Sequence, residues 1–338
     1  MTTPATKRAS VRVPASTSNL GAGFDCVGMA IDKWLRVSAE IRDDGRAQVH
    51  IARTGTLRAL DRTGPSDVRD DLLYVGFRAA LDACSGSDGF KGSIHFDADS
   101  DIPVARGLGS SAAALLAGAA VANAAFGLLL TNDVLAQICA RIERHGDNAG
   151  AAALGGAILV TPQWPSLYFT QLPVHESLGF AFAVPDFETH TELARASLPS
   201  EVPFRTAVSA AARSAALVHG LTTGSRQLLT AGLNDVLHVE HRKPLIPHYE
   251  RVVRAARSAG AYGATLSGSG SSIVAIAPRE TAPIVAGAMA EAWRSASVPA
   301  DAFATGVGLA GLTVVSLSNR PTPLPPYVSP SRSISPCQ

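Results

Sequence analysis

The chain has 338 residues, of which 46% are hydrophobic and 17% are charged. This composition can form a large core and excludes a wholly disordered protein. The length fits two domains or one large α/β unit with extensions. A formal net charge of +1 lacks the broad basic field that nucleic-acid binding requires, so we expect no nucleic-acid partner. The four cysteines are scattered and the first ten residues lack the apolar core of a signal peptide, which predicts a cytoplasmic protein with reduced thiols.

The first 100 residues show the alternation of apolar and polar side chains that predicts an N-terminal sheet. After a mobile leader at 1–8 we expect a strand at 10–14, and then a loop at 14–25 whose Gly, Ser and Asn residues bring backbone close to a ligand. The remaining elements of this part are expected to be strands at 35–41, 49–51 and 93–99 and a helix at 72–83.

The stretch P-V-A-R-G-L-G-S-S-A-A-A at 103–114 directly follows the last of these strands. Gly107 and Gly109 let the backbone turn tightly, and Ser110 and Ser111 open an Ala-rich run that we expect to be helical. Such a helix start directs unpaired N–H groups and the positive end of the helix dipole at one place, which predicts a phosphate site. The pattern is neither the Walker motif nor the Rossmann G-x-G-x-x-G.

The Ala-rich run at 112–130 is long enough to raise the question of a membrane helix. Ala and Gly dominate it, and their transfer to lipid gains little, so we expect no membrane span. A second helix is expected from the Thr131 cap to Arg144, followed by a loop, H-G-D-N-A-G-A-A-A-L-G-G, at 145–156 that concentrates an imidazole, a carboxylate and an amide. Prolines at 162–165 suggest a domain boundary.

The second half predicts a mixture of strands and helices around a third Gly/Ser-rich loop, with no internal repeat. The expected strands lie at 168–172 and 179–185 and near Gly306 and Thr313, and the expected helices lie around Arg195 and at 203–221, 225–233, 248–259 and 281–295. We therefore divide the chain into an N-terminal domain at 9–163, a C-terminal domain at 164–318 and a Pro/Ser-rich disordered tail at 319–338.

Three Gly-rich segments in this order resemble the GHMP kinase family, whose members phosphorylate small alcohols such as galactose, homoserine and mevalonate. They read P-A-S-T-S-N-L-G-A-G-F-D at 14–25, P-V-A-R-G-L-G-S-S-A-A at 103–113 and L-S-G-S-G-S-S at 266–272. The likeness covers residues 10–315. It implies an α+β, two-domain fold with an N-terminal ribosomal-protein-S5-like α/β domain, which binds ATP, and a C-terminal ferredoxin-like α+β domain.

Within the family the chain is most similar to the homoserine kinases, whose first motif runs P-A-[ST]-x-A-N-L-G-x-G-F-D and a later one H-x-D-N. Mevalonate and galactose kinases usually carry Lys or Arg in the first motif and Asp where Asn148 stands, whereas residues 16–19 here are S-T-S-N and hold no cation. A chain without that base relies on positioning and charge stabilisation. The resemblance implies transfer of the ATP γ-phosphoryl group to the side-chain hydroxyl of L-homoserine, a step of threonine biosynthesis.

The resemblance assigns the ATP side of the site to the second motif, where backbone N–H groups cradle the phosphates. The residues implied in binding ATP are Pro103, Arg106, Gly107, Leu108, Gly109, Ser110, Ser111 and Ala112. Mg²⁺ is expected on Ser111 and Glu143, since a carboxylate at a helix C-terminus is disfavoured without a cation. The alternatives are a tight turn with a serine cap, and a surface ion pair of Glu143 with Arg141 or Arg144.

On the substrate side, an amino acid needs acids for its ammonium and guanidinium groups for its carboxylate. By motif, Asp25 and Asp147 take the ammonium, and Arg195 and Arg242 take the carboxylate. Asn19, His145 and Thr191 complete the pocket, and Asn148 donates a hydrogen bond to the reacting hydroxyl or the transferring phosphoryl group. The alternatives are loop-forming roles for Asn19, Asp25, His145 and Asn148 and a surface position for Arg242.

The chain departs from the family pattern at four positions. The later motif, usually H-P-D-N-V, reads H-G-D-N-A with changes at 146 and 149, and the third, often S-G-A-G-P-[ST], reads S-G-S-G-S-S with changes at 269 and 271. Losing Pro frees the backbone φ. The substrate is therefore either homoserine or another small hydroxy-amino acid or alcohol. Two further alternatives are that the chain is a catalytically silent nucleotide-binding relative and that it forms a homodimer.

Overall fold

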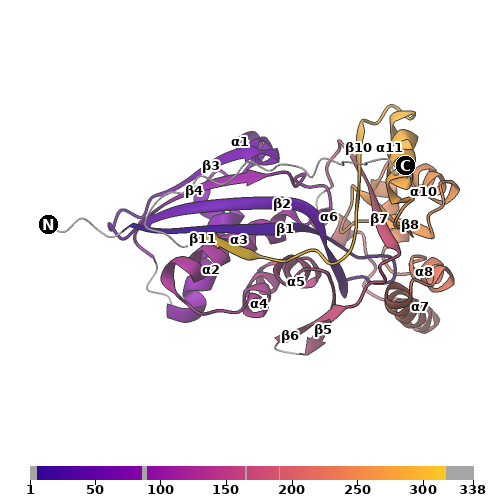
Figure 1. Ribbon diagram of the computed structural model, residues 1–338, viewed down its shortest axis with the longest axis horizontal. Helices are drawn as coiled ribbons and strands as arrows, with labels where there is room; N and C mark the ends of the chain where they lie inside the picture. Colours follow the sequence, from indigo (N-terminus) through magenta and orange to yellow (C-terminus); the bar gives the residue numbers. More distant parts are fainter. Residues whose placement is uncertain (1–5, 86–89, 164–165, 190, 317–338) are drawn as a thin grey trace, which may run out of the picture.

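The computed structural model describes residues 6–85, 90–163, 166–189 and 191–316. Its two longest strands, β1 (Thr6–Ser18) and β2 (Val27–Arg42), pair antiparallel over their full length (Figure 1). The eight residues that connect them are the second half of the first Gly-rich motif. β1 continues through the first half of that motif, so the expected loop at 14–25 begins only at residue 19.

The first sheet gathers strands from both ends of the chain, in the order β11-β1-β2-β4-β3, with β5 and β6 attached beside β2. Its further strands are β3 (Val49–Gly55), β4 (Ser93–Ser100), β5 (Ala157–Gln163), β6 (Ser166–Leu172) and β11 (Thr313–Ser316). β3 runs parallel to β4, which separates it from β2. The first sheet thus extends past residue 163 and is completed by a strand near residue 315, while the domain division at 163 stays a prediction.

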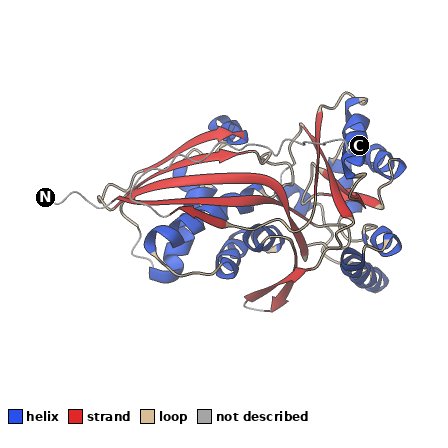
Figure 2. Cartoon of the chain, viewed as in Figure 1, coloured by secondary structure: helices blue, strands red, loops and turns tan. Residues whose placement is uncertain are grey.

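Four helices cover one face of this sheet (Figures 1 and 2). They are α2 (Leu72–Ser85), α3 (Ser110–Phe126), α4 (Asn132–Glu143) and α5 (Asp147–Leu154), and short turns precede them at η1 (Thr56–Ala59), α1 (Leu60–Thr63) and η2 (Val68–Asp70). Ten of the 17 residues of α3, within 112–122, are buried, because its alanines and its glycine let neighbouring backbones approach. Within the described ranges, no helix is long and apolar enough to cross a membrane.

The contact between α2 and α3 depends on two glycines. A Cβ on Gly118 of α3 would overlap the carbonyl oxygen of Leu73, and a Cβ on Gly76 of α2 would overlap that of Leu115. Because a backbone atom cannot rotate aside as a side chain can, an added methyl group forces the helices apart.

We expect Gly118→Ala to lower the free energy of unfolding by about 3 kcal/mol, measured by urea denaturation. Gly287→Ala is the matched control, since Gly287 also lies inside a helix but a Cβ there would meet nothing within 4 Å. That change should stabilise the protein by about 0.5–1 kcal/mol through helix propensity. Equal effects of the two substitutions would contradict the packing argument.

The second sheet is antiparallel, with strand order β10-β7-β9-β8, and belongs to the C-terminal half. Its strands are β7 (Leu178–Pro185), β8 (Gly263–Leu266), β9 (Ile273–Pro278) and β10 (Ala300–Thr305). The helices of this half are α6 (Thr191–Ala196), α7 (Phe204–Thr223), α8 (Arg226–Gly232), α9 (Val239–Arg242), α10 (Tyr249–Ser258) and α11 (Ala282–Arg294), with a short turn η3 (Lys243–Leu245). α10 and α11 pack on this sheet. The expected two-part α+β architecture is confirmed.

Residues 6–8, expected in a mobile leader, belong to β1. A further expected loop is also wrong. The segment 145–156, taken as a loop, holds helix α5, whose alanines are buried against β1 and β2. Turn-forming Gly, Asp and Asn residues at its start concealed the Ala-rich run that follows. The expected tail at 319–338 lies outside the described residues.

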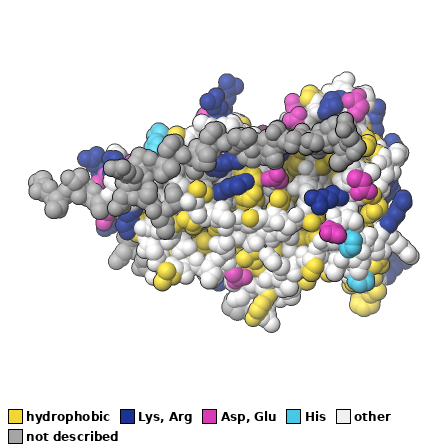
Figure 3. All heavy atoms as spheres, in the orientation of Figure 1, with side chains coloured by type: hydrophobic (Ala, Val, Ile, Leu, Met, Phe, Trp, Pro, Cys, Tyr) yellow, Lys and Arg dark blue, Asp and Glu magenta, His cyan; other side chains and the backbone are white. Residues whose placement is uncertain are grey.

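On the face drawn in Figure 3, Lys and Arg side chains are spread singly, with no broad basic patch among the coloured atoms.

Candidate active site

The phosphate loop has the geometry that its two glycines predict. Gly107 and Gly109 have φ of +69° and +68°, the left-handed region that glycine enters without strain. α3 begins directly after Gly109, and no side chain caps its first turn. The N–H groups of that turn, with the helix dipole behind them, are therefore available to an anion.

The other two Gly-rich motifs hold this loop from both sides. The backbone N–H of Ser16 donates to the carbonyl of Leu108 over 3.2 Å, and the hydroxyl of Ser267 donates to the carbonyl of Gly107 over 2.7 Å. A Cβ on Gly107 would overlap the Ser267 carbonyl, and one on Gly109 would overlap the Ser16 hydroxyl. The three motifs thus form one unit although about 100 and 150 residues separate them along the chain.

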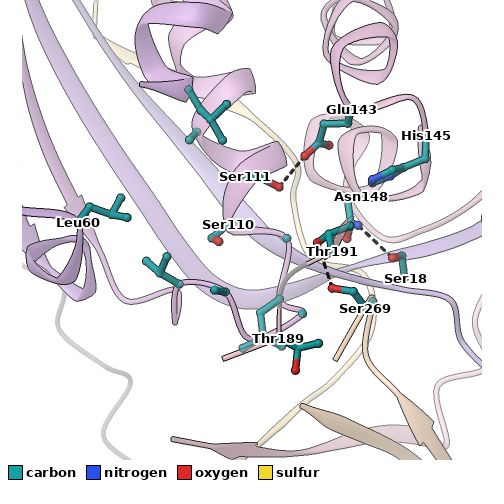
Figure 4. A pocket seen from close by; sticks show the side chains of 18 of the residues that line it. Ser18, Leu60, Ser110, Ser111, Glu143, His145, Asn148, Thr189, Thr191 and Ser269 are labelled. Carbon is teal, nitrogen blue, oxygen red and sulfur yellow. Dashed lines mark hydrogen bonds between the residues drawn. The ribbon is translucent and has the colours of Figure 1, made fainter. Parts of the chain in front are cut away.

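Ser111 and Glu143 meet at the start of α3 and the end of α4 (Figure 4). The Ser111 hydroxyl donates to Glu143 Oε1 over 2.5 Å, while Glu143 Oε2 is buried with no hydrogen-bond partner. Burial raises the pKa of this carboxyl above its ordinary value. A buried carboxylate oxygen left without a partner is the environment in which a bound cation stabilises the charged form.

The carboxamide of Asn148, at the start of α5, is held by two serines of β1. Ser16 Oγ donates to Asn148 Oδ1 over 3.0 Å. Asn148 Nδ2 donates to Ser18 Oγ over 3.0 Å (Figure 4). One amide hydrogen of Asn148 remains, and its side chain lines the same cavity as the phosphate loop.

His145 and Asp147 form a buried ion pair behind Asn148. His145 Nδ1 lies 2.9 Å from Asp147 Oδ1, and the Asp147 side chain is only 1% exposed. Burial by itself lowers the pKa of His145, but the hydrogen bond and charge of Asp147 outweigh it and raise the pKa to about 9. Although burial raises the pKa of Asp147, the His145 contact holds it below its ordinary value. At neutral pH the pair is imidazolium and carboxylate.

This pair predicts a pH dependence of stability. Because the folded pKa of His145 exceeds its ordinary 6.5, its contribution is complete below pH 6.5 and is lost as pH rises through 9. The free energy of unfolding should fall by about 3 kcal/mol at most over this range. Urea titrations from pH 6 to 10 should show a smaller fall in His145→Asn, whereas His95→Asn, which changes an exposed imidazole, should match the wild type. Parallel profiles for His145→Asn and wild type would contradict the assignment.

Asp25 and Arg195 face each other across the cavity from the first motif and from α6. Arg195 Nη2 donates to Asp25 Oδ1 over 3.0 Å and Nη1 donates to Oδ2 over 3.1 Å, which is a bidentate pair. Their side chains are 34% and 43% exposed, so both charges remain accessible. A zwitterion can exchange partners with such a pair, its ammonium on the carboxylate and its carboxylate on the guanidinium.

Asn19, Thr191 and Arg242 complete this end of the cavity. Asn19 Oδ1 accepts from the backbone N–H of Asp25 over 2.9 Å and its Nδ2 donates to the carbonyl of Gly268 over 3.0 Å, so it also shapes the loop. Thr191 Oγ1 lies 3.2 Å from Ser269 Oγ. Arg242 is only 2% exposed and donates from Nε to the carbonyl of Ala194 over 3.1 Å, which places it inside the site rather than on the surface.

Most of these groups line one cavity of about 490 Å³. Of the residues that the sequence singles out, those whose atoms line it are Asn19, Asp25, Gly107, Leu108, Gly109, Ser110, Ser111, Glu143, His145, Asn148, Thr191, Arg195 and Arg242. Pro103, Arg106, Ala112 and Asp147 do not line it. Arg106 donates to the carbonyls of Pro185 and Asp186, so its side chain ties the phosphate loop to the end of β7.

Two parts of the cavity are not predicted from the sequence. Ser18 contacts Asn148, a contact that the period-two spacing of Ser16 and Ser18 on a strand could have suggested. The wall beyond the phosphate loop is largely apolar and comprises Leu57, Leu60, Pro65, Leu72 and Val104. Apart from Val104, which belongs to the second motif, no motif marks these residues, since they come from short segments that only the fold brings together.

The chain matches two protein-family models in order: the one described as GHMP kinases N terminal domain over residues 72–156, and the one described as GHMP kinases C terminal over residues 214–295. The homoserine kinase of Microchaete diplosiphon is 35% identical over 292 residues, covering 86% of this chain and 92% of that protein. The homoserine kinase of Picosynechococcus is 35% identical over 305 residues, covering 90% and 98%.

Solved structures agree with this likeness. The crystal structure of homoserine kinase from Cytophaga hutchinsonii matches with a TM-score of 0.81 at 28% identity, over 91% of this chain and 97% of that one. The L. major mevalonate kinase, in complex with R-mevalonate, matches with a TM-score of 0.61 at 16% identity over 92% of this chain and all of that one, which shows a shared fold alone. By sequence, by both family models and by fold, the chain belongs to the GHMP kinase family.

Proposed function

We propose that this chain is an ATP-dependent kinase that phosphorylates the side-chain hydroxyl of L-homoserine, giving O-phospho-L-homoserine and ADP. The observation that carries the proposal is the pairing of Asp25 with Arg195 in the same cavity as the phosphate loop. One end of the cavity is suited to an anion, and the other presents an acid and a guanidinium to an amino acid. Relatives that are 35% identical over most of their length and carry this name support it.

In this proposal the N–H groups after Gly109 hold the phosphates, and the apolar wall that includes Leu57, Leu60 and Leu72 takes the adenine ring. Asp25 binds the ammonium of homoserine, and Arg195 and Arg242 bind its carboxylate. The free amide hydrogen of Asn148 then points at the reacting oxygen. The homoserine hydroxyl oxygen bonds to the γ-phosphorus as the bond from that phosphorus to the bridging oxygen breaks. ADP leaves with the bridging oxygen, and the hydroxyl proton is released to the transferred phosphoryl group and then to water. Catalysis therefore depends on alignment and on stabilising the charge that moves.

Ser111 and Glu143 fit a magnesium ion, because the unpartnered Glu143 Oε2 supplies a carboxylate ligand beside the start of α3. No described group of three or more His, Cys, Asp or Glu side chains could hold a metal alone. Mg²⁺ usually takes one or two protein ligands and completes its shell with phosphates and water, so this sparse donor set is suitable. When bound there, the ion neutralises charge that develops on the phosphates.

Glu143→Gln should raise the Mg²⁺ concentration for half-maximal activity by about tenfold or more, since the amide keeps the size and the Ser111 contact but loses the charge. The measurement is ADP release against free Mg²⁺ at saturating ATP and homoserine. Glu188→Gln, on an exposed acid that pairs with Arg106, is the control and should keep the wild-type curve. An unchanged curve for Glu143→Gln would remove Glu143 from the metal site.

The direct test is coupled ADP release by the purified protein with a panel of homoserine, threonine, serine, mevalonate and shikimate. We expect homoserine to give the highest kcat/KM. Turnover of mevalonate alone would identify a kinase for a different alcohol, and ATP binding without turnover on any alcohol would identify a silent relative. The free thiols of Cys26, Cys84 and Cys139 support a cytoplasmic location for this activity.

A further inference from the structure

Ser18 lies at the end of β1, two residues after Ser16, so both side chains project from the same face of the strand. That face contacts Asn148. Ser16 Oγ donates to Asn148 Oδ1 over 3.0 Å. Ser18 Oγ accepts from Asn148 Nδ2 over 3.0 Å (Figure 4). Thr17, between them, faces away and lies 2.8 Å from the hydroxyl of Ser267. One strand therefore forms hydrogen bonds with both the oxygen and the nitrogen of the Asn148 carboxamide.

The hydroxyl of Ser18 is not needed to build the strand. The first-motif pattern quoted above, P-A-[ST]-x-A-N-L-G, has alanine at this position, and this chain has serine. The backbone is held independently, because the carbonyl of Ser18 accepts from the N–H of Gly268 over 2.9 Å. The residue is only 1% exposed, and burying a hydroxyl is unfavourable unless it makes hydrogen bonds. The hydroxyl of Ser18 must therefore contribute through the hydrogen bonds that it makes in the site.

The oxygen of that hydroxyl is directed at the site, where it accepts from Asn148 Nδ2. Asp147, the residue before Asn148, lies in the same buried region. Burial raises the pKa of Asp147, but His145, the backbone N–H of Asn148 and, last, the hydroxyl of Ser18 bring it below the ordinary value.

We propose that Ser18 is a positioning residue for phosphoryl transfer: its hydroxyl fixes the Asn148 carboxamide so that the second amide hydrogen points into the cavity at the reacting oxygen. The proposal rests on the proposed function through the role of Asn148. Rotation of an asparagine carboxamide about χ2 is broad and weakly hindered, so one contact fewer lets it populate unproductive orientations. Alignment of reacting groups affects kcat rather than substrate binding.

The test is a double-substitution cycle of Ser18→Ala and Asn148→Ala, measured as kcat and both KM values with single-turnover rates for the slow variants. Ser18→Ala should lower kcat by about 5–20-fold and change the KM for homoserine and for ATP by less than about twofold. In the Asn148→Ala background it should change kcat by less than about twofold, because the group that it positions is gone. Ser10→Ala, a buried serine of the same strand outside the cavity, is the control and should keep the wild-type kcat.

Three results would overturn the proposal: a wild-type kcat in Ser18→Ala, the same fold-loss with and without Asn148, or a raised KM for homoserine at unchanged kcat, which would make Ser18 a substrate ligand. Thermal unfolding of Ser18→Ala within a few degrees of wild type shows that the fold is kept. If the protein phosphorylates another alcohol of the panel but not homoserine, the proposed function is wrong, and the role of Ser18 is tested by the same cycle with that alcohol. If no alcohol of the panel causes ADP release, both the proposed function and the proposed role of Ser18 are wrong.

Discussion

Asn148→Ala should lower kcat by about 10²–10³-fold while the KM for homoserine stays within about threefold of wild type. The reason is that the single free amide hydrogen of Asn148 meets an oxygen whose charge changes most in the transition state, and one such preorganised donor contributes on this scale. The ground state should gain little from it, because the proposed function assigns the far end of the substrate to Asp25 and Arg195, which pair with each other in the same cavity. Steady-state ADP release against homoserine concentration gives both constants.

The control for this change is Asn234→Ala, which removes an exposed asparagine outside the cavity and should leave both constants unchanged. A wild-type kcat for Asn148→Ala would remove Asn148 from catalysis. A raised KM at constant kcat would instead assign it to substrate binding.

Asp25→Asn should raise the KM for homoserine by about 100-fold and leave the KM for ATP within about twofold. The substitution removes the partner of the substrate ammonium and, at the same time, the partner of Arg195. Two charge-assisted hydrogen bonds are lost, and a tenfold change in affinity corresponds to about 1.4 kcal/mol. The proposed function places ATP at the other end of the cavity, beside Gly107 and Gly109, so the KM for ATP should not respond.

Substrate analogues sharpen this prediction. 4-Hydroxybutanoate lacks the ammonium, so Asp25→Asn should affect its turnover far less than that of homoserine. Glu40→Gln is the matched control, since Glu40 forms a partly exposed pair with Arg8 over 2.8 Å outside the cavity. An unchanged KM for homoserine, or an equal loss with both substrates, would contradict the assignment of Asp25 to the ammonium.

Local chemistry explains what could be predicted from the sequence. The turn at Gly107 and Gly109, the helix that starts at Ser110 and the Thr131 cap follow from short-range rules, and the structure confirms each of them, with Thr131 Oγ1 accepting from the N–H of Val134. The first strands were predicted for the same reason, because alternation of apolar residues depends only on neighbours in the chain.

Other features needed information that no local window contains. The helix at Asp147–Leu154 forms because its alanines fill the space against β1 and β2, which overrides the turn preference of the residues at its start. The parallel pairing of β3 with β4, across a crossover that includes α2, and the addition of β11 to β1, about 300 residues apart, are likewise set by the packing of the whole sheet.

The site divides in the same way. The sequence by itself determined the phosphate loop and the kinds of side chain that a kinase for an amino acid needs, since glycines with positive φ and a helix start create an anion site from about five consecutive residues. Only the tertiary structure decided that Asp25 faces Arg195, that Asp147 lies buried behind His145, and that Ser16 and Ser18 grip Asn148. These contacts join residues up to 170 positions apart or depend on which side chains the core encloses, and those are properties of packing that no short segment contains.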